Sequence, residues 1–348
     1  MLKLLKQSTL TACRHLGLLR MMASSSWRHR RLLILCYHGL ALKDEHQWEP
    51  LLYVTPAHFR RRMEMIADGG FTVLHLDSAI GMLKNGALPP KSIVITFDDG
   101  FYDFYEVAFP ALQEFGFPAT VYQTTYYADH RFPIFNLVVN YIFWRAHRRT
   151  FDTGKFGLRQ SFDLSKLAGR EYATNAFRTF ARDHFYTPAQ KDALAAGIAA
   201  ELGVDYDEIR SLRMLQLMTA VEITEVSERG IDIQLHTHRH RTPHDAKLFT
   251  REIRDNREWI RTRIGRQPSH FCYPSGIYRH EFLPWLREEN IASAATCEIG
   301  LAAKDCNPLL LPRLSDSANL SEAEFDGWLA GVNSFLPRRR LPRPMTSL

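Results

Sequence analysis

Short apolar runs alternate along this chain with segments of helical pattern, and this alternation constrains the fold more than any other feature. Each run has the length of one strand and is followed by polar residues or glycine. The runs are residues 32–37, 71–76, 92–97, 119–123, 231–235, 269–273 and 293–297. Strands that alternate with helices indicate a parallel sheet or barrel. About seven strands in 348 residues predict the α/β class and a distorted, incomplete (β/α) barrel.

Helical segments between the runs carry start and stop signals. Pro56 suits the first position of a helix, and the glycines at 69 and 70 end it. Residues 104–115 form a second helical segment, closed by Gly116. Ser321 and Glu324 form a capping box for a last helix. A further helix, ended by Gly265, is indicated by an apolar stripe at helical spacing: Phe249, Ile253, Ile260 and Ile264.

One segment interrupts the alternation. Residues 130–228 are mostly helical in pattern, most clearly at 173–182 and 189–202, and they predict an insertion in the barrel. A decorated crossover connection is the alternative interpretation. The predicted organisation is therefore a basic amphipathic segment at 1–30, a barrel at 31–320 and a C-terminal helix with a basic tail at 321–348.

The net charge of +6 comes from the two ends of the chain. Residues 1–31 carry seven lysines and arginines without an acid, and residues 338–348 carry four arginines without an acid. The body between them has 33 basic and 38 acidic residues, which argues against a nucleic-acid partner. Basic ends suit peripheral contact with an anionic membrane surface. They are equally compatible with solvated ends that bind nothing specific.

The N-terminal segment interleaves leucines with basic residues, which predicts an amphipathic helix on a membrane or on the protein body. Its apolar run is too broken for a secretory signal, although a mitochondrial-type presequence stays open. Five cysteines, an odd number without a CxxC pair, argue against a disulfide framework and for a reducing compartment. We therefore expect a protein that is cytoplasmic or peripheral at the inner face of the membrane.

Polar clusters follow four of the predicted strands, at residues 37–39, 96–100, 236–240 and 273–276. In a parallel barrel the carboxyl ends of all strands share one rim, and active sites form there. Four clusters that are far apart in the sequence should therefore meet in space. This expected convergence is a stronger argument for a site than any single cluster.

The residue types in these clusters predict a metal site. Asp98 and Asp99 follow a buried strand, and neighbouring residues there point in different directions. One carboxylate can then bind a metal while the other faces a water. His236 and His240 can converge on the same cation, and zinc accepts such nitrogen and oxygen ligands. A base beside a metal-activated water describes a hydrolase. Two histidines with one carboxylate also describe an iron oxygenase, but that chemistry leaves Asp98 without a role.

These residues, in this order, resemble the motifs of the polysaccharide deacetylases of the NodB-homology type, carbohydrate esterase family four. The run Thr96-Phe97-Asp98-Asp99-Gly100 matches the first motif of that family, and His236-Thr237-x-x-His240 matches the second. Residues 271–276 resemble the third motif but carry Cys272 and Ser275 where the family has an arginine and a tyrosine. Cys36-Tyr37-His38 resembles the branch in which the acid histidine precedes the first motif.

The resemblance implies a role for most of these residues. Asp99, His236 and His240 would hold a divalent metal, usually zinc. Asp98 would be the catalytic base, and His38 the acid that protonates the departing amine.

The third motif carries two further expectations. The backbone N–H of Ser275 would face the oxyanion, because a backbone donor survives a change of side chain. The missing arginine leaves Asp98 without its usual partner. We predict that Arg313, which follows a short apolar run and carries a permanent charge, replaces it.

The predicted activity is removal of N-acetyl groups from an N-acetylated sugar, either a polymer or a lipid-linked precursor, by hydrolysis of a non-peptide carbon–nitrogen bond. The metal would polarise a water and the acetamide carbonyl. A non-catalytic alternative is a degenerate barrel that binds a glycan or a membrane surface without turnover.

Overall fold

The computed structural model describes residues 2–146 and 149–336. The predicted basic tail at 338–348 lies outside the described residues. The chain divides into two compact units. The first comprises the chain up to Tyr126 and again from Ala220, and the second is Tyr127–Thr219. The second unit overlaps most of the segment for which an insertion is predicted.

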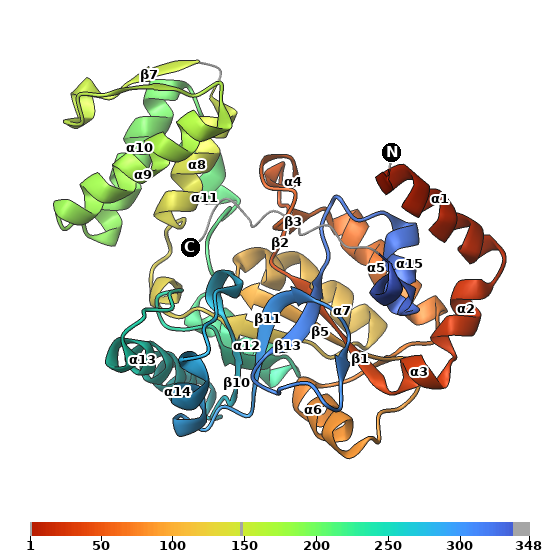
Figure 1. Cartoon of the computed structure of the whole chain (residues 1–348). Coiled ribbons are helices and arrows are strands. Elements are labelled where there is room, and N and C mark those ends of the chain that lie inside the picture. The colour runs from red at the N-terminus through yellow and green to blue at the C-terminus, as the bar shows by residue number, and fades with distance from the viewer. Residues whose placement is uncertain (1, 147–148, 337–348) are drawn as a thin grey trace. The chain divides into compact units, whose positions relative to one another are not determined.

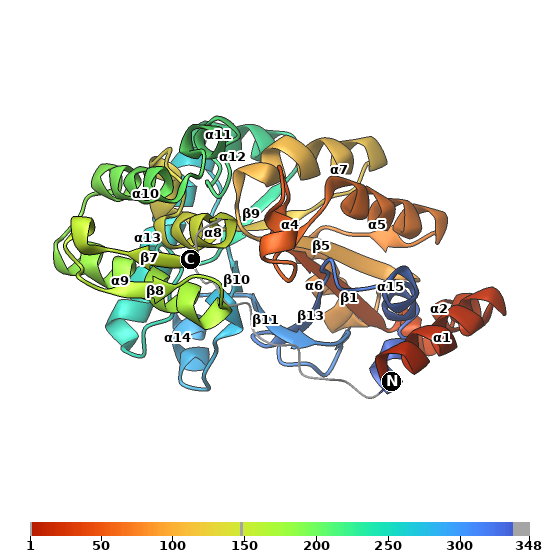
Figure 2. The ribbon, with the colours of Figure 1, turned by 90° about the horizontal axis from the view of Figure 1, so that it is seen from above.

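Seven parallel strands of the first unit form a closed ring within the part of the chain that the structure describes. They are β1 (Arg31–Tyr37), β5 (Ser92–Asp99), β6 (Thr120–Gln123), β9 (Asp232–Leu235), β10 (His270–Cys272), β11 (Ser293–Ile299) and β13 (Leu311–Ser315). β1 closes the ring by pairing with β5 on one side and β13 on the other. Helices α5 (Pro56–Asp68), α7 (Phe109–Phe115), α12 (Ala220–Glu228) and α13 (Ala246–Ile264) lie outside the strands (Figure 2). The predicted (β/α) barrel is confirmed.

One predicted strand is much shorter than expected and lies outside the ring. Residues 71–76 yield only β4 (Thr72–Val73), which pairs with the first two residues of β5 outside the ring. That edge of β5 is open because β6 pairs with β5 only from Thr96 onward. The strand that completes the ring is β13, which has Pro312 and Arg313 at its centre. Proline and a charged residue are both uncommon inside a buried strand, so the sequence pattern conceals it.

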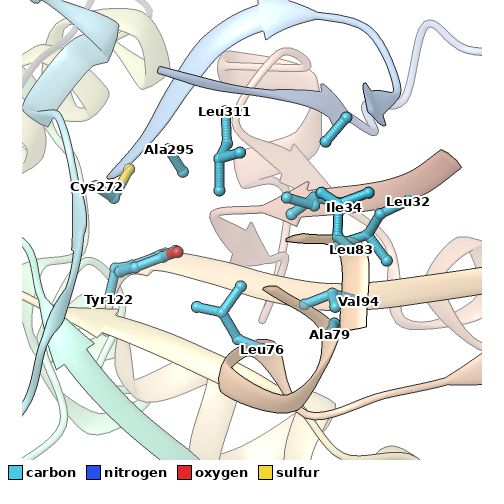
Figure 3. Packing of buried hydrophobic residues seen from close by; sticks show 11 residues of the cluster. Leu32, Ile34, Leu76, Ala79, Leu83, Val94, Tyr122, Cys272, Ala295 and Leu311 are labelled. Carbon is cyan, nitrogen blue, oxygen red and sulfur yellow. The ribbon is translucent and has the colours of Figure 1, made fainter. Parts of the chain in front are cut away.

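Side chains alternate along the ring strands between the barrel interior and the helices. Leu32 and Ile34 of β1 and Val94 of β5 belong to one buried cluster with residues of four other ring strands (Figure 3). Helix α6 (Leu76–Asn85) packs Leu76, Ala79 and Leu83 against it. Burial of each large aliphatic side chain contributes about 1.5–3 kcal/mol. The same alternation continues along β5, so Asp98 shares the inward face of Val94.

The outward face of the same strands is aromatic. Tyr37 of β1 and Phe97 of β5 stack with ring centroids 5.4 Å apart. Phe59 of α5 packs on both rings, and Phe104 packs edge-on against Phe97. Such pairs contribute about 0.5–1.5 kcal/mol beyond their buried area. They hold β1 and β5 side by side just below the rim.

The predicted helix ends agree with the structure. Thr55 caps α5 ahead of Pro56, and the left-handed Gly265 ends α13. Both hydrogen bonds of the capping box between Ser321 and Glu324 are present in α15 (Glu322–Leu329). The segment 104–115 begins with a π-helical turn, η1 (Phe104–Ala108), and continues as α7. The shorter elements of the first unit are α4 (Glu45–Trp48), α14 (Phe282–Glu288), β2 (Gly39–Leu40), β3 (Tyr53–Val54), β12 (Ala302–Ala303), η4 (Pro274–Gly276) and η5 (Val332–Phe335).

The N-terminal segment is helical and packs on the body of the first unit. It forms α1 (Leu2–His15), α2 (Leu18–Ala23) and α3 (Ser26–His29), with the left-handed Gly17 between the first two. Leu10 and Leu19 pack with Ala330 after α15, and Arg14 forms an ion pair with Asp326 at 2.9 Å. Among the described residues, no helix is long and apolar enough to cross a membrane.

The second unit has its own core of helices and one hairpin. The helices α8 (Phe135–Arg145), α9 (Leu167–Asp183) and α10 (Pro188–Leu202) pack together (Figure 1). The remaining elements are α11 (Tyr206–Ser211), η2 (Tyr126–Asp129), η3 (Gly154–Phe156) and the antiparallel strands β7 (Thr150–Asp152) and β8 (Ser161–Asp163). Phe143, Phe151 and Phe177 contact one another with centroids 5.7–6.0 Å apart. The predicted helices at 173–182 and 189–202 lie inside α9 and α10.

Candidate active site

The predicted polar clusters lie at the carboxyl ends of β1, β5, β9 and β10, on one rim of the barrel. Side chains of the first three clusters meet there, although β5 and β9 are separated in the ring by β6. The geometry arises because the chain enters every ring strand from the same end. Convergence of the four clusters follows from the topology.

Asp99 lies between the two motif histidines. Its Oδ1 is 3.1 Å from Nε2 of His236 and 3.1 Å from Nε2 of His240. All three side chains are buried. Separations of this size are close to the edge of about 3.3 Å in a tetrahedral site with bonds of about 2.0–2.1 Å. The three atoms could therefore bind one cation together.

The hydrogen bonds around this cluster also suit a cation. Nδ1 of His236 lies 2.9 Å from the carbonyl oxygen of Cys272. A carbonyl only accepts, so Nδ1 carries the proton and Nε2 of a neutral ring presents a lone pair. Metal-binding histidines characteristically use such a second contact. Oδ1 of Asp99 is buried without a hydrogen-bond partner among the described residues. The residues present therefore fit a divalent metal.

The electrostatics of the cluster point the same way. Burial would raise the pKa of Asp99, but His240 and His236 hold that pKa well below its usual range. Burial would lower the pKa of His236, but the nearby Asp99 and Asp98 raise it above its ordinary value. The raised pKa of His236 shows that the two carboxylates make this pocket negative, and the lowered pKa of Asp99 shows that positive charge beside it is stabilising. Such a pocket favours a proton or a metal ion between these groups.

Asp98 faces a different partner. Arg313 of β13 donates from Nη1 to Oδ1 and from Nη2 to Oδ2, both at 2.7 Å, and both side chains are buried. The guanidinium also donates to Thr96 Oγ1 at 3.3 Å and, from Nε, to the carbonyl oxygen of Thr296 at 2.9 Å. Burial would raise the pKa of Asp98, but Arg313 holds it well below the usual range. Asp98 is therefore ionised at any working pH.

Two thiols and His38 complete the surroundings of Asp98. Cys272 Sγ lies 3.4 Å and Cys36 Sγ 3.6 Å from Asp98 Oδ2. His38 Nε2 is 3.7 Å from the same oxygen. Burial raises the pKa of both thiols, so they act as neutral donors. Burial lowers the pKa of His38 despite the opposing charges of Asp98 and Asp99, which makes its imidazolium a stronger acid.

Left-handed backbone recurs at the functional clusters. Asp99, Thr237, His240 and Ser275 all have φ between 50° and 70°. Each costs on the order of 1 kcal/mol for a residue with a Cβ atom. Gly100 follows at φ 82°, where a Cβ atom would lie 2.0 Å from Gln123 Oε1. Strain of this kind persists only where surrounding contacts hold it.

The predicted site residues differ in how closely the structure ties them together. Measured contacts join Asp98 to His38 and Arg313, and Asp99 to His236 and His240. Ser275 is exposed on the loop after β10 and belongs to the same rim.

The sequence patterns missed four contributors: the thiols Cys36 and Cys272, and Glu252 and Asn256 of α13. A signal for the last two exists in the sequence. Glu252 and Asn256 share the buried face of α13 with Phe249, Ile253 and Ile260. A polar residue inside an apolar helical stripe usually has a specific partner.

Comparison with known proteins identifies the motifs. The family model described as polysaccharide deacetylase matches residues 85–166 and 200–293. The match includes the two aspartates, both motif histidines and Ser275, but neither His38 nor Arg313. The Bacillus subtilis protein YxkH, named as a polysaccharide deacetylase, is 32% identical over 104 residues, which are 28% of this chain and 35% of that protein.

A second relative is the poly-beta-1,6-N-acetyl-D-glucosamine N-deacetylase of Escherichia coli K12. It is 28% identical over 100 residues, 28% of this chain and 15% of the relative. The chain thus matches much less than two thirds of the length of either curated relative.

Solved structures resemble the fold over most of the chain. The Streptococcus pyogenes deacetylase PplD, in complex with acetate, superposes with a TM-score of 0.56 at 19% identity over 85% of this chain and 96% of that chain. IcaB from Ammonifex degensii superposes with a TM-score of 0.54 at 16% identity over 86% and 97%. At these identities the likeness shows a shared fold.

Proposed function

Because this chain belongs to the polysaccharide deacetylase family, we propose that it hydrolyses the acetamide of an N-acetylated sugar or polysaccharide. The observation that carries the proposal is the contrast between two consecutive carboxylates. Asp99 meets two histidine nitrogens and Asp98 meets an arginine. A metal ligand and a carboxylate that rests in its ionised form are thereby available side by side.

The residues of the metal site would be Asp99, His236 and His240, which fit a divalent metal such as zinc. When bound, the metal would supply Lewis-acid polarisation of the acetamide carbonyl and of a water. In an iron oxygenase the second carboxylate would have no role. The Asp98–Arg313 pair therefore favours hydrolysis over that alternative.

Three groups of the chain would carry the proton transfers and the oxyanion. Asp98 takes a proton from the attacking water, and the bidentate contact with Arg313 keeps the carboxylate aimed and ionised. The backbone N–H of Ser275 donates to the oxyanion. His38 protonates the departing amine, which is a poor leaving group without an acid.

The substrate and location extend the same proposal. The sugar would be polymeric or lipid-linked, and the basic ends would allow peripheral contact at the cytoplasmic face of a membrane. The docked N-terminal helices support a surface position for the first of these ends. We assign no nucleic-acid partner.

The test is the bound-metal content of the purified protein beside two variants. His236→Ala removes one proposed ligand. The matched control is His244→Ala, which removes an exposed histidine just after the second motif. We expect about one zinc in the wild type and in the control, and none in His236→Ala. Iron in the wild type would restore the oxygenase alternative. No metal in the wild type, even after zinc is supplied, would indicate a degenerate barrel that binds without turnover.

A further inference from the structure

The loop that joins the two motif histidines has no regular secondary structure and contains two left-handed residues, Thr237 and His240. Within it, the Thr237 hydroxyl accepts a hydrogen bond from the Arg241 N–H at 3.0 Å. One internal bond does not determine the direction of His240. Further constraints come from the segment after β6, where the Tyr126 N–H donates to the His238 carbonyl oxygen at 2.8 Å, and from helix α13.

Asn256 holds the start of the loop. Its Oδ1 accepts from the His236 N–H at 3.0 Å, and its Nδ2 donates to the Gln123 carbonyl at 3.0 Å and to Thr125 Oγ1 at 2.9 Å. Thr125 Oγ1 in turn lies 2.9 Å from Nδ1 of His238. Asn256 is fully buried, so water does not compete for these bonds. It ties the end of β9 to the end of β6.

Glu252, one helical turn earlier, holds the tip of the loop. Its carboxylate accepts from the Arg239 N–H at 2.8 Å, from Arg239 Nη1 at 3.1 Å and from Arg241 Nε at 2.7 Å. Its own carbonyl accepts from the His238 N–H at 3.1 Å. The side chain is 1% exposed. Glu252 therefore ties positions 238, 239 and 241 of the loop to the helix, through its buried carboxylate and its main-chain carbonyl, without touching the candidate metal ligands.

We propose that Glu252 and Asn256 are positioning residues for metal binding, which hold the loop so that His236 and His240 face Asp99 before the ion arrives. This inference rests on the proposed metal site and deepens it. The strained loop would relax without these contacts, and the ion would then have to impose the ligand geometry. Partners of metal ligands typically change affinity by about 10–100-fold when removed.

The chain offers a matched control, a carboxylate that pairs with arginines of the same helix. Glu289 is also buried and also accepts from two arginines, Arg254 at 2.7 Å and Arg257 at 3.3 Å, both on α13. Its contacts lie away from the histidine loop. Glu252→Gln and Glu289→Gln therefore remove similar charges from similar ion pairs, and only the first involves the site.

The experiment measures zinc affinity by competition with a chelator in the full chain. We expect the zinc Kd to rise by about 10-fold or more in Glu252→Gln and to stay within about twofold in Glu289→Gln, while both metal-free variants lose similar stability. The visible absorption of bound Co²⁺, which reports ligand geometry, should change in Glu252→Gln alone. Equal zinc affinities in the wild type and Glu252→Gln, or equal losses in both variants, would overturn the inference.

Milder variants keep the test valid if Glu252→Gln fails to fold. Arg241 is 57% exposed and pairs with Glu252, and Arg254 is 69% exposed and pairs with Glu289. Arg241→Met should raise the zinc Kd about two- to fivefold, the range of an exposed ion pair, and Arg254→Met should not. A larger rise of the zinc Kd in Arg254→Met than in Arg241→Met would overturn the inference. A wild type that binds neither zinc nor cobalt would overturn the proposed function itself and this inference with it.

Discussion

Asp98 and Asp99 are consecutive residues at the end of β5, yet their charges are balanced in different ways. Asp98 points into the barrel and meets Arg313, so the protein itself supplies its counter-charge. Asp99 turns into the left-handed region and meets two imidazoles, and that of His236 donates from its other nitrogen to the carbonyl oxygen of Cys272. The pleat of a strand separates the two directions. One carboxylate has its counter-charge in the folded chain, and under the proposed function the other would bind a cation.

This comparison predicts the largest effect for the base. Asp98→Asn should lower deacetylation by about 10³–10⁴-fold, the upper part of the range for general-base catalysis, and leave the bound metal in place. Acetate release from an N-acetylglucosamine oligomer and the metal content of the same sample measure both. An active Asp98→Asn variant would refute the assignment of Asp98 as the base. An Asp98→Asn variant without metal would show that Asp98 also takes part in metal binding.

The second prediction concerns the counter-charge. Arg313→Met should reduce the free energy of unfolding by about 3–5 kcal/mol, because it leaves a buried carboxylate unpaired. Adding Asp98→Asn to Arg313→Met should recover part of that loss, since the unpaired charge is then gone. Urea unfolding of the single and double variants measures the coupling. Additive losses, or full deacetylation activity in Arg313→Met, would show that the pair has no role.

Removal of the metal should lower the stability of the protein only where Asp99 is intact, because Asp99 and not Asp98 is the proposed ligand. At zinc concentrations about 100 times the Kd, the ion should stabilise the wild type by about 2.7 kcal/mol, and a chelator should abolish this gain. Asp99→Asn should show no zinc-dependent shift in Tm, whereas Asp98→Asn should keep it. Thermal unfolding with and without chelator tests the contrast. A shift lost in both variants would mean that the ion needs both carboxylates.

The smallest effect concerns a third carboxylate on the same segment. Burial raises the pKa of Asp103, and Glu45 and Asp99 add to the shift, although the Leu40 N–H bonds to it. The folded state then binds more protons than the unfolded state above about pH 3.9, so stability falls as pH rises through the folded pKa.

Asp103→Asn keeps an acceptor for the Leu40 N–H and removes the loss of stability at high pH. We expect equal stability near pH 4 and a more stable variant at pH 8, because the variant has no buried carboxylate to ionise. The gain should be larger after chelation, when Asp99 regains its full charge. Denaturant unfolding at both pH values measures it. A variant that is less stable at pH 8 would contradict the assumed protonation.

Much of the site was predictable because its signals are local. Strand-length apolar runs end at Asp98, His236 and Tyr273, and each is followed by polar residues or a turn. Arg313 was predictable as a permanently charged residue that follows a short apolar run. Its strand was not, because Pro312 and the inward charge hide the alternation on which strand prediction depends. Residues 71–76 illustrate the converse: they have a strand pattern, but β1 and β6 already pair with most of β5.

The amino-acid sequence by itself determined the alternating α/β architecture, the helix ends and the candidate ligands, since hydrophobic period, capping and motif spacing are properties of neighbouring residues. Only the tertiary structure decided the bidentate geometry of the Asp98–Arg313 pair, which thiols surround Asp98, and how Glu252 and Asn256 hold the histidine loop. Those contacts join positions that are 11 to 215 residues apart. They exist because the ring closes, which brings the ends of all its strands to one rim.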